Sequence, residues 1–128
     1  MADINKLKKI LAVDDEEISL SLVKNFLKDE YEVITAKSGI EALEHLDNKL
    51  VPDLILLDIL MPVMDGWETF NRIRGISSLH DTPIAFLTSV NKPEDIKYAR
   101  EIGAADYIVK PYNKANQLER IKDMIGYY

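Results

Sequence analysis

The chain has 128 residues and a formal net charge of -6, and 47% of its residues are hydrophobic. This length favours one domain with a core of its own, and the hydrophobic share is that of an ordinary globular protein. The acidic balance argues against nucleic acid as a direct partner. Because the chain has no cysteine, it has neither a disulfide framework nor a thiolate metal site, which favours a reducing compartment.

The N-terminal residues, Met1 to Lys6, contain no apolar stretch typical of a secretory signal. No apolar run in the sequence approaches the length needed to cross a bilayer. We therefore expect a cytoplasmic protein without membrane contact.

Short apolar runs alternate with helical patterns along the whole chain. The apolar runs predict five strands, over residues 8–13, 31–36, 53–57, 83–87 and 106–109. The helical patterns predict five helices, over residues 18–27, 38–46, 67–73, 93–102 and 114–125. Five rounds of strand then helix predict an α/β fold: one domain over 1–128 with a doubly wound, five-stranded parallel sheet and helices on both faces.

Local signals mark several helix ends and faces. Ser38 and Glu41 form a capping-box pattern, Pro93 suits a first helical turn, and Gly103 is a predicted helix stop. The apolar faces predicted for the five helices consist of Ile18, Leu22 and Phe26 beside Val23 and Leu27; Ile40, Leu43 and Leu46; Trp67, Phe70 and Ile73; Ile96 and Ala99; and Leu118, Ile121 and Ile125.

Polar side chains stand where four of the predicted strands end. Asp14 and Asp15 follow the first strand, Asp58 the third, Thr88 the fourth and Lys110 the fifth. Ligands of open parallel sheets bind outside the carboxyl ends of the strands, and these ends share one edge. We therefore expect three carboxylates, one hydroxyl and one ammonium group to meet in a shallow pocket.

Three carboxylates in one pocket repel each other unless a pKa rises or a cation binds. Oxygen ligands without histidine or cysteine favour a hard cation, and an open site favours Mg²⁺. A carboxylate such as Asp58 can attack a phosphoryl group and form an aspartyl phosphate. Lys110 and the hydroxyl of Thr88 can then contact phosphoryl oxygens.

With these motifs together, the chain resembles a receiver domain of the two-component response regulators, of the single-domain, chemotaxis-regulator kind. The resemblance runs from Ile10 to about Ile125. The motifs that carry it are Asp14-Asp15, Asp58 with Met61-Pro62 and Met64-Asp65-Gly66, Thr88-Ser89, and Lys110-Pro111.

The resemblance implies a role for each residue of the pocket. Asp58 would accept a phosphoryl group from a histidine kinase or a phosphotransfer protein. Asp15 and Asp58, with the backbone carbonyl of Leu60, would bind Mg²⁺, and Asp14 would act mainly through water. The resemblance also implies the sheet order 2-1-3-4-5.

The resemblance further implies a switch rather than an enzyme. Thr88 would move toward the phosphoryl group, and Tyr107 would turn inward as the switch aromatic. The fourth helix, fifth strand and fifth helix would then bind a downstream protein partner. The Lys110-Pro111 bond is expected to be cis by the same resemblance.

Two apolar residues flank the expected phosphorylation site. Leu60 lies two positions after Asp58, and Val90 lies two positions after Thr88. Residues at these positions influence in this family how easily water reaches the aspartyl phosphate. Because an apolar side chain cannot orient an attacking water, we predict slow self-dephosphorylation.

Other interpretations compete with this one. A metal-dependent phosphatase or phosphotransferase of the haloacid-dehalogenase type needs Asp-x-Asp after the first strand, whereas Asp14 and Asp15 are adjacent. A nucleotide- or flavin-binding domain needs a phosphate loop there, which the acidic run 14–17 does not provide. A degenerate, scaffold-only receiver is disfavoured by the intact acidic set.

Several residues also have a purely structural interpretation. The acidic run 14–17 could favour a helix N-terminus, and Tyr107 could be a half-buried strand aromatic. Asp106 could pair with Arg120 across a dimer, or both could be surface charges of little consequence. The sequence is therefore compatible with a monomer or a weak homodimer.

The other residues singled out have structural expectations. We expect Trp67 in the core, Met61 and Met64 in loop packing, and His45 and His80 on the surface.

Overall fold

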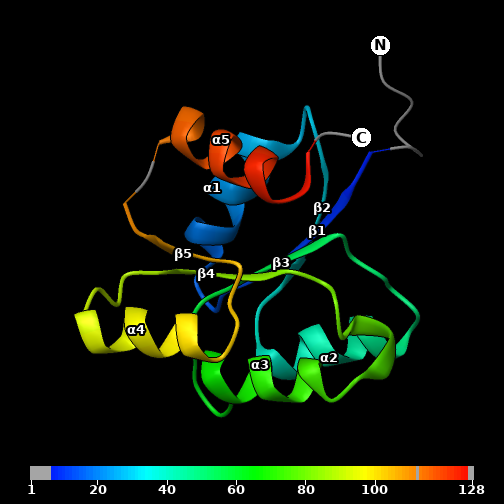
Figure 1. Cartoon of the computed structure of the whole chain (residues 1–128). Helices are drawn as coiled ribbons and strands as arrows, with labels where there is room; N and C mark the ends of the chain where they lie inside the picture. The colour runs from blue at the N-terminus through cyan, green and yellow to red at the C-terminus, as the bar shows by residue number, and fades with distance from the viewer. Residues whose placement is uncertain (1–6, 112, 127–128) are drawn as a thin grey trace.

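The chain folds into a parallel sheet with helices on both faces (Figure 1). The computed structural model describes residues 7–111 and 113–126. The strands are β1 (Lys9–Val13), β2 (Glu32–Ala36), β3 (Leu54–Leu57), β4 (Ile84–Thr88) and β5 (Asp106–Val109). The helices are α1 (Glu17–Leu27), α2 (Gly39–Asp47), α3 (Gly66–Arg74), α4 (Pro93–Glu101) and α5 (Lys114–Ile125), with a short 3-10 helix η2 (Ser77–Leu79).

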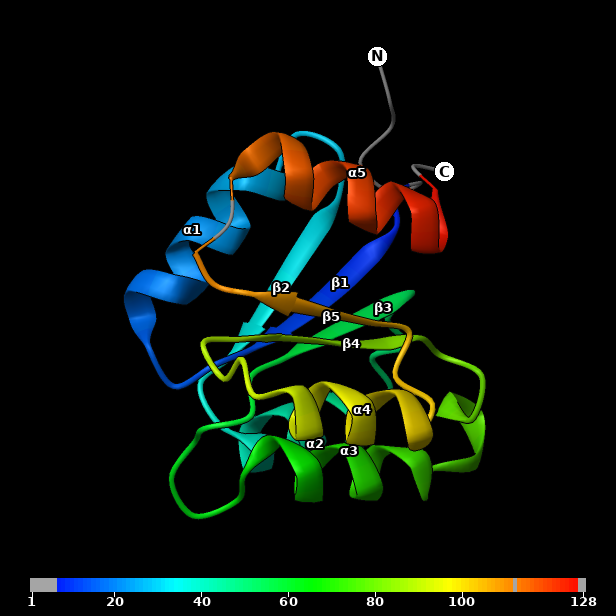
Figure 2. The same cartoon turned by 60° about the vertical axis from the view of Figure 1, so that its left-hand side comes forward.

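The sheet order is β2-β1-β3-β4-β5 and every pair of neighbouring strands is parallel, which confirms the predicted fold class. Helices α1 and α5 cover one face of the sheet, and α2, α3 and α4 cover the other (Figures 1 and 2). No helix in the described part of the chain is both long enough and apolar enough to span a membrane.

Alternate residues of each strand point into two separate cores. In β1, Leu11 and Val13 belong to the core beneath α2, α3 and α4, whereas Ile10 and Ala12 belong to the core beneath α1 and α5. A strand buried on both faces has no polar alternation, so its sequence is a continuous apolar run. This explains why the three central strands, β1, β3 and β4, were predictable to within one residue at each end. The edge strands β2 and β5 are only half-buried and contain polar residues.

The predicted apolar face of α1 was wrong in part. Ile18 is 77% exposed and Leu22 is also exposed, whereas Leu20 is buried together with Val23 and Leu27. Residues two positions apart lie about 200° apart around a helix, so Ile18 and Leu22 point away from the face that carries Leu20. The four-residue spacing of Ile18 and Leu22 therefore led to the selection of two residues on the solvent-facing side of the helix.

The faces of the other helices differ from the prediction in smaller ways. In α2, Ile40 is exposed, whereas Ala42 and Leu46 are buried. In α3, Phe70 and Ile73 are buried as predicted, and Trp67 packs against the same core.

The predicted helix ends were correct. Ser38 precedes α2, and its hydroxyl accepts a hydrogen bond from the Glu41 backbone N–H at 3.0 Å. The carboxylate of Glu41 in turn accepts the N–H of Lys37, one residue before the cap. Gly103 follows the end of α4 with φ 91, a conformation that favours glycine.

Candidate functional site

Strand register brings the two buried carboxylates together. Val13 in β1 pairs with Leu57 in β3, so the residues that follow them, Asp14 and Asp58, leave the sheet side by side. The N–H of Asp58 continues this pairing by donating to the carbonyl of Val13 at 2.9 Å. Asp58 is only 4% exposed and Asp14 is similarly buried.

The other side of the site comes from β4 and β5. Thr88 is the last residue of β4, is fully buried, and pairs with Val109 in β5. The next residue, Lys110, donates its backbone N–H to the carbonyl of Thr88 at 2.9 Å. Four of the five expected residues, Asp14, Asp58, Thr88 and Lys110, therefore meet at one sheet edge, whereas Asp15 is exposed. The Lys110-Pro111 bond is cis, as expected.

The backbone after Asp58 is held close to the start of α3. The N–H of Ile59 donates to Asp58 Oδ1 at 2.8 Å, and the N–H of Gly66 donates to the carbonyl of Ile59 at 2.8 Å. A Cβ atom on Gly66 would lie 2.2 Å from the carbonyl oxygen of Asp58, so only glycine fits there. Asp65 caps α3 by accepting the N–H of Glu68 at 2.9 Å.

The ammonium group of Lys110 lies among the carboxylates. Its Nζ is 2.6 Å from Asp14 Oδ2 and 3.8 Å from Asp58 Oδ2. A third neighbour is the hydroxyl of Ser19 on α1, at 3.2 Å, which was not among the predicted site residues. Lys110 therefore supplies the positive charge that two buried carboxylates require.

The protonation of Asp58 reflects this environment. Burial is the main cause that raises the pKa of Asp58 to about 6, and the charge of Asp14 acts in the same direction. Hydrogen bonding from Thr88, the charge of Lys110 and the N–H of Ile59 oppose this rise. For Lys110, burial alone would lower the pKa, but the hydrogen bond to Asp14 and the charge of Asp58 raise it overall. Lys110 is therefore protonated at neutral pH.

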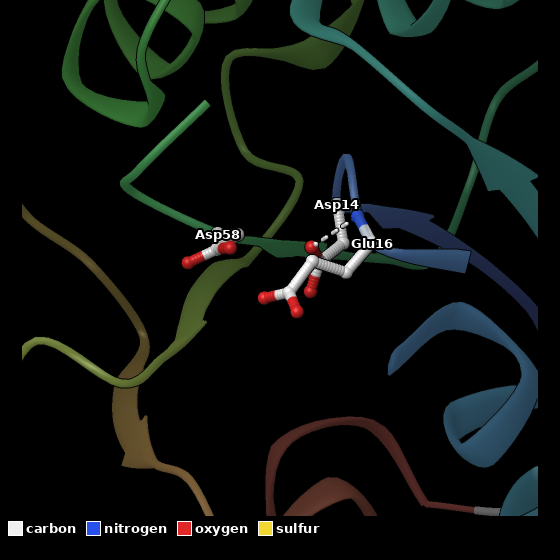
Figure 3. Close-up of side chains that lie close together, drawn as sticks. All are labelled: Asp14, Glu16 and Asp58. Atoms are coloured by element: carbon white, nitrogen blue, oxygen red, sulfur yellow. Dashed lines mark hydrogen bonds between the residues drawn. The ribbon is translucent and has the colours of Figure 1, made fainter. Parts of the chain in front are cut away.

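Three carboxylates could hold a cation. Ligand oxygens of Asp14, Glu16 and Asp58 lie within 4.8 Å of one another (Figure 3). The backbone N–H of Glu16 also donates to Asp14 Oδ1 at 3.0 Å. An oxygen-only donor set of this kind fits a hard divalent cation such as Mg²⁺.

The membership of this cluster differs from the predicted metal ligands. Asp15 is exposed and lies outside the cluster, whereas Glu16, which was not predicted as a ligand, lies inside it. Glu16 has an extended backbone with φ -91 and ψ 115. Because alternate residues of an extended segment point to the same side, the spacing of Asp14 and Glu16 is the sequence signal that could have identified it.

Two hydroxyl groups bind the loop between β4 and α4. The backbone N–H of Val90 donates to Thr88 Oγ1 at 3.3 Å, and the hydroxyl of Tyr107 donates to the carbonyl of Val90 at 2.7 Å. Burial, with the charges of Asp95 and Asp58, raises the pKa of the Tyr107 hydroxyl to about 12, so it stays a donor. Thr88 and Tyr107 are thus joined through one residue, Val90.

Asp106 and Arg120 pair within one chain. The guanidinium of Arg120 donates to the two carboxylate oxygens of Asp106 at 2.9 and 2.6 Å, and also to the carbonyl of Tyr107 at 3.0 Å. The two side chains are 33% and 27% exposed, and they pair within the chain, an arrangement that the sequence analysis did not consider. Their contact ties α5 to β5 next to Tyr107.

The remaining residues singled out from the sequence pack in the interior or lie at the surface. Met61 and Met64 are buried in the loop after β3, as expected. Trp67 packs with its ring centroid 4.8 Å from that of Phe86. His80 is exposed, and His45 is half-exposed with Nε2 3.2 Å from the carbonyl of Thr35.

Comparison with known proteins matches nearly the whole chain to one family. The family model described as "response regulator receiver domain" matches residues 10–122. The chemotaxis protein CheY of Halobacterium salinarum is 34% identical over 119 residues, which cover 92% of this chain and 97% of that protein. The transcriptional regulatory protein CpxR of Escherichia coli is 38% identical over 120 residues, which cover 93% of this chain but only 50% of that protein.

Solved structures agree with these sequence matches. The chemotaxis protein CheY4 of Vibrio cholerae superposes with a TM-score of 0.86 at 37% identity, covering 93% of this chain and 99% of that one. The BeF3-activated DrrB receiver domain superposes with a TM-score of 0.80 at 28% identity, covering 92% of this chain and 97% of that one. The chain thus matches nearly all of some relatives and about half the length of others.

Proposed function

Because the chain belongs to the response regulator receiver domains of two-component signalling, we propose that Asp58 is its phosphoacceptor. The donor is a histidine kinase or a phosphotransfer protein. One observation carries this proposal: the buried carboxylate of Asp58 lies at the sheet edge between the Lys110 ammonium, 3.8 Å away, and the hydroxyl of Thr88. Phosphorylation makes the chain a signalling switch rather than an enzyme with turnover of its own.

The chemistry needs an ionised nucleophile and compensation of negative charge. With a pKa of about 6, Asp58 is mostly ionised at pH 7. A carboxylate oxygen attacks phosphorus, an O–P bond forms, and the bond between phosphorus and the donor nitrogen breaks, its electron pair leaving with the imidazole. Lys110 and the Thr88 hydroxyl then contact the phosphoryl oxygens.

The acidic cluster supports a magnesium site. The cluster itself offers the carboxylates of Asp14, Glu16 and Asp58 as ligands. Family resemblance adds Asp15, which lies outside the cluster, and the backbone carbonyl of Leu60, with Asp14 then acting mainly through water. A bound Mg²⁺ would offset the negative charge of the incoming phosphoryl group. Loss of phosphorylation on chelation with EDTA would support this assignment.

The output surface is formed by α4, β5 and α5. Its support is the hydrogen-bonded connection from Thr88 through Val90 to Tyr107, which lies on β5. When Thr88 moves toward the phosphoryl group, Val90 and Tyr107 move with it and alter this surface. A downstream protein binds there, and the chain works in the cytoplasm without touching nucleic acid directly.

The lifetime of the phosphorylated form is set by the residues beside Asp58. Leu60 is 62% exposed, Val90 is half-buried, and both line the same pocket. Neither side chain can orient a water for attack, so we expect slow loss of the phosphoryl group.

Replacing Leu60 by Asn and Val90 by Glu should shorten the half-life of the phosphorylated form severalfold, as followed by intact mass in excess Mg²⁺. A wild-type half-life of seconds would contradict this expectation.

The proposal is tested by intact mass after incubation with Mg²⁺ and acetyl phosphate. We expect one added phosphoryl group in the wild type, none without Mg²⁺, and none in Asp58→Ala. Asp81→Ala, which removes a fully exposed aspartate, is the matched control and should be modified like the wild type. A phosphoryl group that persists in Asp58→Ala would show that another residue is the acceptor.

A further inference from the structure

The ammonium of Lys110 has a partner that the proposed phosphoryl transfer does not use. Its Nζ lies 3.2 Å from the hydroxyl oxygen of Ser19, besides 2.6 Å from Asp14 Oδ2. An ammonium group has three donors, so these two contacts leave one donor uncommitted. The carboxylate of Asp58, at 3.8 Å, lies just beyond hydrogen-bond distance.

The backbone of Ser19 is anchored in helix α1. It lies in the first turn of α1, and the next residue, Leu20, is buried in the core beneath α1 and α5. Lysine, in contrast, carries its charge on a flexible four-carbon chain and accepts many geometries. The hydrogen-bond partners of the ammonium therefore determine where it lies. One of these partners is the hydroxyl of Ser19, whose backbone belongs to α1.

Water is a poor substitute for the hydroxyl at this place. The side chain of Lys110 is only 15% exposed, and those of Asp14 and Asp58 are less exposed still. A buried ammonium that loses one acceptor turns toward the next one within reach. Here that acceptor is Asp58 Oδ2.

Building on the phosphoacceptor role proposed above, we propose that Ser19 is a positioning residue for Lys110. Its hydroxyl holds the ammonium on the Asp14 side, 3.8 Å from Asp58 Oδ2 and beyond hydrogen-bond distance of it. Without the hydroxyl, Lys110 hydrogen-bonds directly to Asp58 Oδ2, an oxygen of the carboxylate that attacks phosphorus. That contact has to break before transfer, so the rate of phosphorylation falls.

The test compares phosphorylation rates with acetyl phosphate and Mg²⁺, followed by intact mass. Loss of one hydrogen bond to a charged group should slow Ser19→Ala about threefold to tenfold. Ser19→Thr keeps a hydroxyl at the same place and should restore most of the rate. Ser21→Ala is the matched control, because Ser21 is an exposed serine on the same helix, and it should react like the wild type.

A second comparison separates positioning from a general effect on folding. In a Lys110→Met background, Ser19→Ala should cause no further slowing, because the group that Ser19 positions is absent. Urea unfolding of each variant measures stability independently of the rate. Slowing of Ser19→Ala by the same factor with and without Lys110 would overturn the proposal.

Failure of this proposal can be told apart from failure of the phosphoacceptor role. If the wild type is phosphorylated at Asp58 and Ser19→Ala reacts as fast as Ser21→Ala, the role of Ser19 alone is overturned. The same conclusion follows if Ser19→Thr is as slow as Ser19→Ala. A wild-type chain that gains no phosphoryl group overturns both proposals together.

Discussion

At the scale of single residues, the buried carboxylate of Asp58 lowers the stability of the fold at neutral pH. Its pKa of about 6 in the folded state lies above the ordinary value of 3.8. Between these two values the folded chain binds more protons than the unfolded chain, so stability falls as pH rises through this window. Above pH 6 the loss is complete, and it amounts to roughly 1–3 kcal/mol.

We therefore predict that Asp58→Asn raises the free energy of unfolding by about 1–3 kcal/mol at pH 7.5 without Mg²⁺. The gain should shrink as the pH falls from 6 and be small at pH 4, where Asp58 is protonated in the folded chain and close to half-protonated in the unfolded chain. Urea unfolding in EDTA between pH 4 and 8 measures it. Asp81→Asn, at a fully exposed position, should change little. A gain that is the same at every pH would contradict the stated cause.

At the scale of single residues, the sequence predicted some of the site residues and missed others. Asp14, Asp58, Thr88 and Lys110 were identified because each directly follows or ends a buried strand, and strand ends converge by topology. The sequence analysis missed the contacts of residues that lie beyond the strand ends, Glu16 and Ser19. The inward turn of Glu16 and the approach of Ser19 to Lys110 depend on where α1 begins and packs, which no short motif encodes.

At the scale of elements, the junction between β3 and α3 depends on the absence of a side chain at Gly66. A Cβ there would approach the backbone of Asp58 and Ile59, at 2.2 Å from a carbonyl oxygen and 2.7 Å from Cα. We predict that Gly66→Ala costs about 2–4 kcal/mol of stability and slows phosphorylation, because the backbone of Asp58 must shift. Thermal unfolding and the acetyl phosphate rate check both effects.

Gly75 provides the control for this prediction, since it ends the same helix. The nearest atom to a Cβ on Gly75 is the carbonyl oxygen of Arg72, at 3.3 Å, which is tight but not prohibitive. Gly75→Ala should therefore cost less stability and leave the phosphorylation rate unchanged. Equal effects of the two substitutions would show that close approach at Asp58 is not the cause.

Helix α5 contains a buried polar side chain that its apolar pattern did not predict. Gln117 is 0% exposed, and within the described residues neither polar atom of its side chain has a hydrogen-bond partner. The pattern had selected Leu118, Ile121 and Ile125, of which only Ile121 is fully buried. Glutamine is seldom fully buried, so sequence reasoning had no ground to select Gln117.

We predict that Gln117→Leu stabilises the fold by about 1–3 kcal/mol, because an unsatisfied buried amide is replaced by an apolar group of similar volume. Urea unfolding at pH 7.5 measures the change. Gln117→Glu has nearly the same shape and should destabilise, since it buries a charge. A loss of stability in Gln117→Leu would instead mean that the amide makes a hydrogen bond to water.

At the scale of the whole molecule, hydrogen bonds connect the proposed phosphorylation site to the last helix. Thr88 and Tyr107 bind the two backbone groups of Val90, and Arg120 on α5 binds the carbonyl of Tyr107. Arg120 also forms the paired contact with Asp106. Val90, Tyr107 and Arg120 thus form a continuous hydrogen-bonded connection between Thr88 and α5.

The same Asp106–Arg120 contact leads to a prediction about assembly. Because the two charges are already paired within one chain, neither needs a second copy of the protein to satisfy it. We predict that the unphosphorylated chain is a monomer, as measured by sedimentation equilibrium, and that Arg120→Ala remains one. That substitution should lower the free energy of unfolding by about 1 kcal/mol, the scale of a partly exposed two-point ion pair. A dimer that dissociates on Arg120→Ala would show instead that the pairing crosses between chains, as in the dimer considered from the sequence.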